Sequence, residues 1–597
     1  EAGLDENTDY NVYELIANPR EGQKLEECRD LLLQQIEKLK NGEFDENMLS
    51  AIIANMKVDD MKRLESNQGR AYAMENMFVH NVNPSAFVSR YQIMGRLTKQ
   101  DIINFAKTHF TNDYTVVYKR LGEDKTTKKV VKPAITPVSI NRVDQSTFLK
   151  NINAMTVSEL KPDFIQFDHA IQKDKMTNGT PYWYIKNNDN QLFNLYYLFD
   201  MGSLSDKALS PAMSYLQLLG TDKQSAEQVQ KAFFQLACEF GVNVTDDQTY
   251  VTLSGAQDHF EDAVTLLENV LNHCSADESA LNKMVEGIIK DRTDAMKNKG
   301  AIRSRLTAYA VYGENSPATF ILKNEEMKAL KASDLVAKIH GLENYEHKIC
   351  YVGPAEMNTV KASLQKLHPM PAKPLTVPVA FKPIRQTTSA QVLFVDYPMV
   401  QAEIVWVNKN MDWSDKSIPT VRLFNEYFGG SMSGVVFQTI RESKALAYSC
   451  NANYATPSKK EDPFYMNAYV GTQADKLNEA IPAMNELFTN MPYSEKAFTD
   501  AKEALKNKIE SERIRRNNIL FTYLSAQKLG LDKDIRQDVY HSLSTLDFNA
   551  IRAFEETHIK SAPYTYCVLA SSKKVKMEDL QKYGPVTTLT LNQLFGY

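Results

Sequence analysis

Hydrophobic and polar residues follow helical and strand periods along this chain, and their order recurs. A Leu-x-x-x-Asp segment followed by an apolar residue opens an expected helix at Leu97, Leu330 and Leu543. After each helix, β-branched and aromatic residues predict a strand, at residues 114–118, 348–352 and 564–569. The copies are 233 and 213 residues apart. Three matches with the same order of elements indicate a repeated domain of about 210–230 residues.

A second recurring module supports the repeat. An apolar strand is expected at Phe193–Asp200 and another at Ala402–Val407, and each is followed by a helix. That helix is interrupted at Gly220 and at Gly429, in both cases 27 residues after the start of the strand. Two complete copies are therefore expected, at residues 166–375 and 376–597. The predicted fold class is α+β, with tandem domains that each pack helices on a largely antiparallel sheet.

The beginning of the chain matches only the closing part of a copy. Residues 1–120 contain the closing module, preceded by an expected strand at 11–16 and two helices. We expect them to be the C-terminal part of a truncated domain, with roughly 95 residues missing upstream, because each full copy is about 215 residues long. Residues 121–165 hold three prolines and little periodicity, which predicts a hinge linker.

Composition narrows the class of protein. The chain has 597 residues, of which 43% are hydrophobic and 24% charged, as in ordinary globular proteins. The net charge of −5 offers no basic field, which argues against a nucleic-acid partner. No stretch reaches 18 uncharged apolar residues, so no transmembrane segment is expected. The six cysteines form no C-x-x-C pair and are interpreted as buried thiols.

Two segments carry a family resemblance. Tyr427–Ser433 (YFGGSMS) is followed by Phe437–Tyr448, which ends in Arg-x6-Tyr, and Leu219–Ser225 precedes Phe240–Val244 in the middle copy. These segments resemble the pitrilysin family, the insulin-degrading-enzyme-like zinc metallopeptidases of the inverzincin type. The resemblance implies four related α+β domains in two halves joined by a hinge. This chain would span the latter part of domain two, the hinge, domain three and domain four.

The zinc signature of that family is absent from this sequence. It is H-x-x-E-H, in which two His on one helix face share a zinc ion and the Glu activates the bound water. None of the ten histidines forms it; the nearest segment, Glu343–His347, is interpreted as a surface turn. Ser210–Leu219 carries no ligand where the family's zinc helix would fall, and Glu426 in the last copy cannot hold zinc alone. We therefore expect a non-metallated domain three, no metal and no catalytic residue in this chain, which alone would be inactive.

The resemblance assigns two substrate-binding residues, Arg441 and Tyr448. Arg441 would hold the substrate backbone, and Tyr448 would be a transition-state contact whose hydroxyl assists the developing oxyanion. Seven residues place both side chains on one face of a continuous helix, or on either side of a helix–strand joint if Leu446 starts a strand. The alternative is an Arg–Glu surface pair and a tyrosine at the edge of the core.

Other motifs have ordinary structural readings. Gly429–Gly434 follows a helix rather than a strand and lacks Gly-Lys-Ser/Thr, so it predicts a helix break and not a phosphate loop. Arg513–Arg516 is expected on the solvated face of a long helix from about 494. Tyr182–Tyr184 precedes a polar turn at 187–190 and predicts a β-hairpin, with stacking on a peptide as the lesser alternative.

The leading hypothesis is the C-terminal, chamber-forming part of a bacterial zinc endopeptidase that acts on unfolded or extended peptides. The partner would be the N-terminal catalytic half of the same protein, which would carry the zinc. The alternatives are a non-catalytic structural or partner subunit and a peptide-binding module that uses an open sheet edge. A periplasmic or cell-envelope location is favoured over a cytoplasmic one.

Overall fold

A computed structural model describes residues 1–20, 22–120, 122, 126, 145–156, 158–383, 385 and 389–597. It divides into two compact units, Glu1–Lys161 and Pro162–Tyr597. The division falls within the predicted linker 121–165, most of which before residue 145 lies outside the described residues. The domain boundaries at 120, 165 and 375 stay predictions.

The first unit is mostly helical. A short antiparallel hairpin pairs β1 (Ala2–Asp5) with β2 (Val12–Leu15). The helices are α1 (Leu25–Asn41), α2 (Met48–Leu64), α3 (Asn67–Val79), α4 (Pro84–Met94), α5 (Lys99–His109) and α6 (Thr147–Asn153). Gly42 ends α1 with a φ of 74°, a left-handed conformation that glycine adopts without strain.

Two expectations for this unit were wrong. Four described helices, rather than two, precede α5, and residues 114–118 form no strand. Tyr114 and Val117 are 51% and 87% exposed, so their strand propensity is not matched by packing. A strand needs a partner edge and a covered face, and the only sheet described in this unit is the β1–β2 hairpin.

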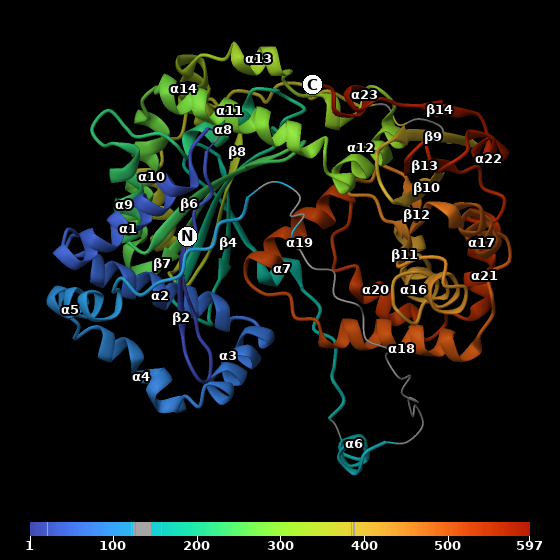
Figure 1. Ribbon diagram of the computed structural model, residues 1–597, viewed down its shortest axis with the longest axis horizontal. Coiled ribbons are helices and arrows are strands. Elements are labelled where there is room, and N and C mark those ends of the chain that lie inside the picture. The colour runs from blue at the N-terminus through green and yellow to red at the C-terminus, as the bar shows by residue number, and fades with distance from the viewer. Residues whose placement is uncertain are drawn as a thin grey trace. The chain divides into compact units, whose positions relative to one another are not determined.

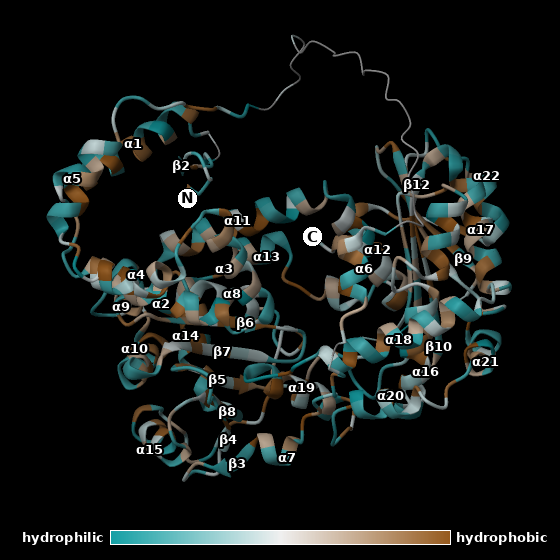
Figure 2. Ribbon diagram, turned by 90° about the horizontal axis from the view of Figure 1, so that it is seen from below, coloured by the Kyte–Doolittle hydropathy of each residue, from teal (hydrophilic) through white to brown (hydrophobic). Residues whose placement is uncertain are grey.

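The second unit contains two sheets, each with six strands among the described residues. The strands of the first are β3 (Gln172–Lys175), β4 (Pro181–Lys186), β5 (Leu192–Phe199), β6 (Cys238–Val244), β7 (Thr249–Ala256) and β8 (His347–Gly353). Their order across the sheet is β3-β4-β8-β5-β7-β6, and Figure 2 shows them in this order. All neighbours are antiparallel except β4 and β8.

The second sheet repeats this topology. Its strands are β9 (Gln391–Asp396), β10 (Gln401–Met411), β11 (Ser449–Ala455), β12 (Phe464–Gln473), β13 (Thr565–Ala570) and β14 (Val586–Thr588). The order is β11-β12-β10-β13-β9-β14. Strands β4 to β8 therefore correspond one by one to β9 to β13, with the same neighbours, and the parallel pair β4–β8 matches β9–β13. The fold class is the predicted one, tandem α+β domains with antiparallel-rich sheets packed by helices.

Most helices of each domain cover one face of that domain's sheet with the apolar stripes that the sequence pattern predicts. Those of the first sheet's domain are α7 (Phe167–Ala170), α8 (Leu209–Leu216), α9 (Ala226–Gln235), α10 (Phe260–His273), α11 (Glu278–Ala295), α12 (Lys299–Tyr312), α13 (Asn324–Lys328), α14 (Ala332–His340) and α15 (Met357–Leu367). Those of the second are α16 (Ile418–Phe428), α17 (Leu477–Thr489), α18 (Glu495–Ser511), α19 (Asn517–Lys528), α20 (Arg536–Ser542), α21 (Phe548–His558), α22 (Met577–Leu580) and α23 (Leu591–Phe595).

The two domains exchange one helix each to cover the other face of the sheets. Helix α12 belongs to the first domain but packs Ile302 and Leu306 on β9, β10 and β13 of the second. Helix α19 belongs to the second domain and packs Leu520 and Tyr523 on Trp183 and other residues of the first sheet. Figure 1 shows α12 beside β9, β10 and β13. Each sheet is thus buried on both faces only when both domains are present.

The structure corrects two local interpretations. Strands β4 and β5 follow one another but are not a hairpin, because β8 lies between them. Tyr182, Trp183 and Tyr184 are all buried, which leaves no face for stacking on a peptide. Helix α18 ends at Ser511, so Arg513–Arg516 lies in the following connection, and the Arg516 side chain is only 10% exposed in an ion pair with Asp189.

Candidate functional site

The helix break after α16 brings that helix against an edge strand. A Cβ on Gly429 would lie 2.4 Å from the carbonyl oxygen of Ala452 on β11. Only glycine permits this approach, so the break that the sequence predicts at Gly429 has a packing cause. Asn425 of α16 then bonds the backbone of Tyr454 twice: its Nδ2 donates to the carbonyl oxygen at 3.0 Å, and its Oδ1 accepts from the amide at 2.7 Å.

These contacts cover part of the outer edge of β11. β11 has β12 on one side and is otherwise an edge strand. Because Asn425 occupies the outward backbone groups of Tyr454, a peptide cannot add to β11 along its whole length. The Ala452 amide lies 3.5 Å from the carbonyl oxygen of Gly429, so the covered part of the edge extends at least to Ala452.

The connection from helix to strand sets the direction of Tyr448. After a short helical turn, residues Phe437–Ser443 form a π-helix (η5), and Ala445 has a φ of 49°. Thr472 of β12 donates its hydroxyl to the carbonyl oxygen of Leu446 at 2.6 Å, which fixes the start of the strand. Leu446 and Ala447 are buried, whereas Tyr448 is 80% exposed. The structure therefore has the helix–strand joint, not the continuous helix.

Arg441 and Tyr448 are neighbours across this joint. The Arg441 guanidinium carbon lies 5.4 Å from the centre of the Tyr448 ring and 4.7 Å from that of Phe437. The nearest carboxylate oxygen, on Glu442, is 3.6 Å away. The cation is thus held by two aromatic faces more than by an ion pair, and such contacts leave its N–H donors available. Tyr448 is too exposed to be part of the core edge.

The residues at the zinc-helix position do not fit a catalytic zinc ion. Helix α8, the first helix after β5, has no His, Cys, Asp or Glu. Its counterpart α16 offers Glu426 alone. A catalytic zinc needs three protein ligands that converge on an open position.

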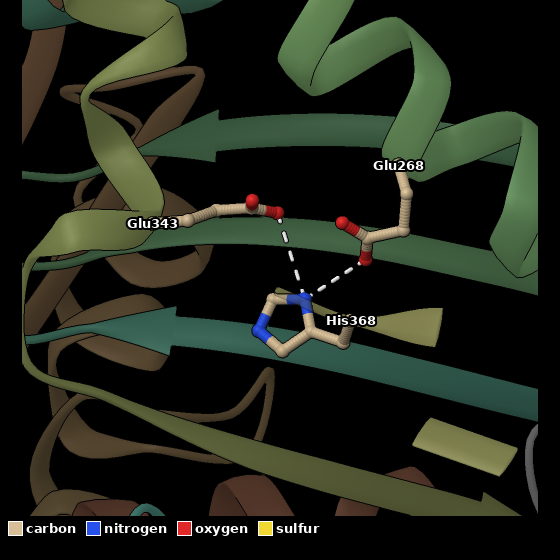
Figure 3. A group of neighbouring side chains, drawn as sticks. All are labelled: Glu268, Glu343 and His368. Carbon is tan, nitrogen blue, oxygen red and sulfur yellow. Dashed lines mark hydrogen bonds and ion pairs between the residues drawn. The ribbon is translucent and has the colours of Figure 1, made fainter. Parts of the chain in front are cut away.

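Glu343 and His347, at the two ends of the predicted surface turn, are buried, whereas Asn344 and Glu346 between them are exposed, so the surface-turn interpretation is wrong for the two end residues. The exposed fractions of Glu343 and His347 are 5% and 6%, and both meet the buried His368. Glu268 of α10 completes the group, which Figure 3 shows with both carboxylates directed at the imidazole of His368. No sequence motif predicts this cluster, because its members come from separate segments of the chain.

Comparisons with known proteins agree with the fold. The model of the peptidase M16 inactive domain matches residues 350–505. The uncharacterized zinc protease YmxG of Bacillus subtilis is 24% identical over 309 residues, 50% of this chain and 73% of that protein. The non-peptidase homolog YmxG of Helicobacter pylori is 21% identical over 400 residues, 63% of this chain and 88% of that protein.

A solved structure extends the likeness over most of the chain. The periplasmic protease PqqL of Escherichia coli aligns with a TM-score of 0.56 and 13% identity, over 91% of this chain and 63% of that protein. The family match agrees with the repeated sheet topology and with the helix break at Gly429. Residues 350–505 are of the peptidase M16 inactive-domain type, and the antiparallel-rich sheets packed by helices resemble those of M16 peptidase domains. No helix in the described residues has the length and apolar character that crossing a membrane requires.

Proposed function

We propose that this chain forms part of the substrate chamber of a zinc-dependent endopeptidase and that Arg441 and Tyr448 contact an extended peptide. The observation that carries the proposal is the pairing of an arginine, which lies over two aromatic rings, with an exposed tyrosine directly before an edge strand. The 80% exposed Tyr448 presents both its ring and its hydroxyl to a ligand, and the neighbouring cation adds hydrogen-bond donors.

The chemistry of the two side chains suits a peptide backbone. The guanidinium of Arg441 presents several N–H donors that can bind a peptide carbonyl oxygen. The Tyr448 hydroxyl can donate one hydrogen bond, which would strengthen as negative charge develops on the scissile carbonyl oxygen. Phe437 keeps the guanidinium from folding away from Tyr448.

We further propose that the zinc ion and its catalytic Glu are supplied by an N-terminal half outside this chain, which alone is inactive. The absence of ligands from α8 and α16 supports this division. The longer PqqL supports it too, because this chain aligns with only 63% of that protein. A bacterial, periplasmic or cell-envelope setting follows the same comparison and is part of the proposal.

The test uses the product of the complete gene and a quenched fluorescent peptide. Tyr448→Phe keeps the ring and removes one donor, so kcat should fall roughly 10²–10³-fold, at the lower end if other groups stabilise the same oxygen. Arg441→Gln should raise KM. Both variants should melt like the unmodified protein, because exposed changes usually cost less than about 0.5 kcal/mol. Tyr493→Phe, at another exposed tyrosine, is the matched control.

The proposal fails if Tyr448→Phe retains full kcat. It also fails if both variants melt early and lose activity only in proportion to folded protein, since their role would then be structural.

A non-catalytic subunit is the second candidate, favoured by the relative that is named a non-peptidase homolog. It predicts that the complete gene product binds extended peptides without turnover at saturating zinc. Binding that Arg441→Gln weakens, with no cleavage, would favour this candidate over the peptidase.

A further inference from the structure

A buried polar cluster joins three segments of the first sheet's domain. Glu268 lies on α10, Glu343 on the 3₁₀ turn Leu342–Asn344, and His368 directly after α15. Their exposed fractions are 7%, 5% and 2%. Among the described residues, this is the one group of three such side chains whose potential ligand atoms all lie within 4.8 Å of one another. Charged groups this deeply buried require a compensating partner.

Hydrogen bonding assigns the protons on two imidazoles. His347 Nδ1 lies 2.8 Å from the carbonyl oxygen of Tyr345, which can only accept, so this nitrogen carries a proton. With the proton on Nδ1, the Nε2 of a neutral His347 ring has a lone pair. His368 Nε2, 3.0 Å away, must therefore donate.

The other nitrogen of His368 is then an acceptor. In the neutral ring, with the proton on Nε2, His368 Nδ1 carries a lone pair. This lone pair faces Glu268 Oε1 at 2.8 Å and Glu343 Oε1 at 3.6 Å. Figure 3 shows both carboxylates converging on this nitrogen. Acceptors that face each other in a buried space repel unless a proton or a metal ion lies among them.

The carboxylates have oxygens left over. Tyr197 donates its hydroxyl to Glu268 Oε1 at 2.6 Å, and Asn272 donates to Glu343 Oε2 at 3.1 Å. Glu268 Oε2 and Glu343 Oε1 are buried and have no hydrogen-bond partner. Each side chain is thus oriented by one neighbour and keeps one oxygen without a donor. A buried carboxylate oxygen without a donor is stabilised when a proton or a metal ion binds to it.

We propose that His368 Nδ1, Glu268 and Glu343 bind a zinc ion that ties α10, the 3₁₀ turn and the end of α15 together. Bonds of about 2.0–2.2 Å in a tetrahedral site place ligand atoms about 3.3–3.6 Å apart; the observed 3.6 Å matches that range, and the 2.8 Å pair would have to separate by about 0.5 Å. One imidazole with few carboxylate oxygens fits zinc better than magnesium or calcium, which require six or more oxygens.

The surroundings match the outer shell of a structural zinc site. A ligating histidine donates its second ring N–H to an acceptor, as His368 does to His347. Tyr197 and Asn272 hold the carboxylates in the same way. The remaining carboxylate oxygens are available for the fourth position. Burial closes the site to substrate, so the ion is structural and separate from the catalytic zinc.

The experiment is metal binding to the full chain. Protein stripped with a chelator is titrated with Zn²⁺ and, separately, with Co²⁺. We expect one ion per chain, a visible cobalt spectrum of tetrahedral intensity and a higher melting temperature. His368→Gln and Glu343→Gln should bind zinc at least about tenfold more weakly. His273→Gln, at the exposed last residue of α10, is the matched control and should bind like the unmodified chain.

A folded, stripped chain that takes up no stoichiometric zinc or cobalt would overturn the proposal, as would equal affinity in His368→Gln. Proton release keeps the test decisive if the variants do not fold. Zinc must displace the protons that neutralise the two carboxyls, so binding at pH 7 should release at least one proton per ion. Binding without proton release would place the ion at a different, exposed site.

Discussion

The buried carboxyls of the cluster make the stability of the metal-free protein depend on pH in an unusual direction. Burial raises the pKa of Glu268 to about 7 and that of Glu343 to about 8, where the second carboxylate adds repulsion. Between about pH 4.5 and pH 8 the folded protein therefore holds protons that the unfolded chain has released. The free energy of unfolding must fall as pH rises through this range.

The histidines oppose this trend only at lower pH. His347 and His368 have pKa values lowered to about 4, so between about pH 4 and 6.5 the unfolded chain binds protons that the folded one does not. This contribution increases stability as pH rises and ends near pH 6.5. From pH 6.5 to 8 the histidine contribution fades, and the two carboxyls dominate the change.

The magnitude follows from the pKa of Glu343. One proton held only by the folded state changes the free energy of unfolding by about 1.4 kcal/mol per pH unit. With a pKa of about 8, Glu343 loses its proton gradually over these 1.5 units, which removes about 2 kcal/mol. For a domain of about 200 residues this lowers the melting temperature by roughly 4–8 °C.

The assay compares melting temperatures at pH 6.5 and pH 8 in the presence of a chelator. Glu343→Gln stays uncharged, so its decrease should be smaller than that of the unmodified chain by those 4–8 °C. Glu346→Gln, three residues further and exposed, should behave like the unmodified chain. Equal decreases in all three proteins would refute the assignment of raised pKa values to this cluster.

Two further predictions address the packing. Gly429→Ala should destabilise the second domain by about 1–3 kcal/mol in thermal melts, because its Cβ would lie 2.4 Å from the Ala452 carbonyl oxygen. Gly287→Ala is the control, because no atom lies within 4 Å of its Cβ; equal melting temperatures of the two variants would refute the close approach. Leu306→Ala on α12 should cost about 2–5 kcal/mol and increase hydrogen exchange in β9 and β13 of the other domain; unchanged exchange there would refute the exchanged-helix packing.

The repeats could be predicted because they rest on local signals. Strand patterns at Phe193–Asp200 and Ala402–Val407 and the interruption at Gly429 depend on neighbouring residues, and the structure has them as β5, β10 and the end of α16. The pairing of strands was less accessible. The turn at 187–190 reads as a hairpin, and nothing local reveals that β8, from residue 347 onward, enters between its arms.

The candidate site residues also divide into those that the sequence predicted and those that only the structure shows. The resemblance gave Arg441 and Tyr448, and the structure places them side by side, although their roles stay predictions. The sequence analysis did not find the buried cluster, because it searched for metal ligands spaced to lie on one helix. Glu268 and His368 are brought together by tertiary packing across a hundred residues of sequence.

The exchange of α12 and α19 bears on how these parts can work together. Each helix buries apolar residues against the other domain's sheet, so separating the domains would expose both outer faces to water. Motion between them is therefore costly, and the unit Pro162–Tyr597 should move as one body in any opening of a chamber. A zinc ion in the first domain would stiffen the same unit at α10 and α15. These two helices pack on one face of the first sheet, and α19 covers the opposite face. If the proposed chamber exists, this unit would contribute a rigid wall to it, and the exposed pair Arg441 and Tyr448 would lie on that wall directly before β11.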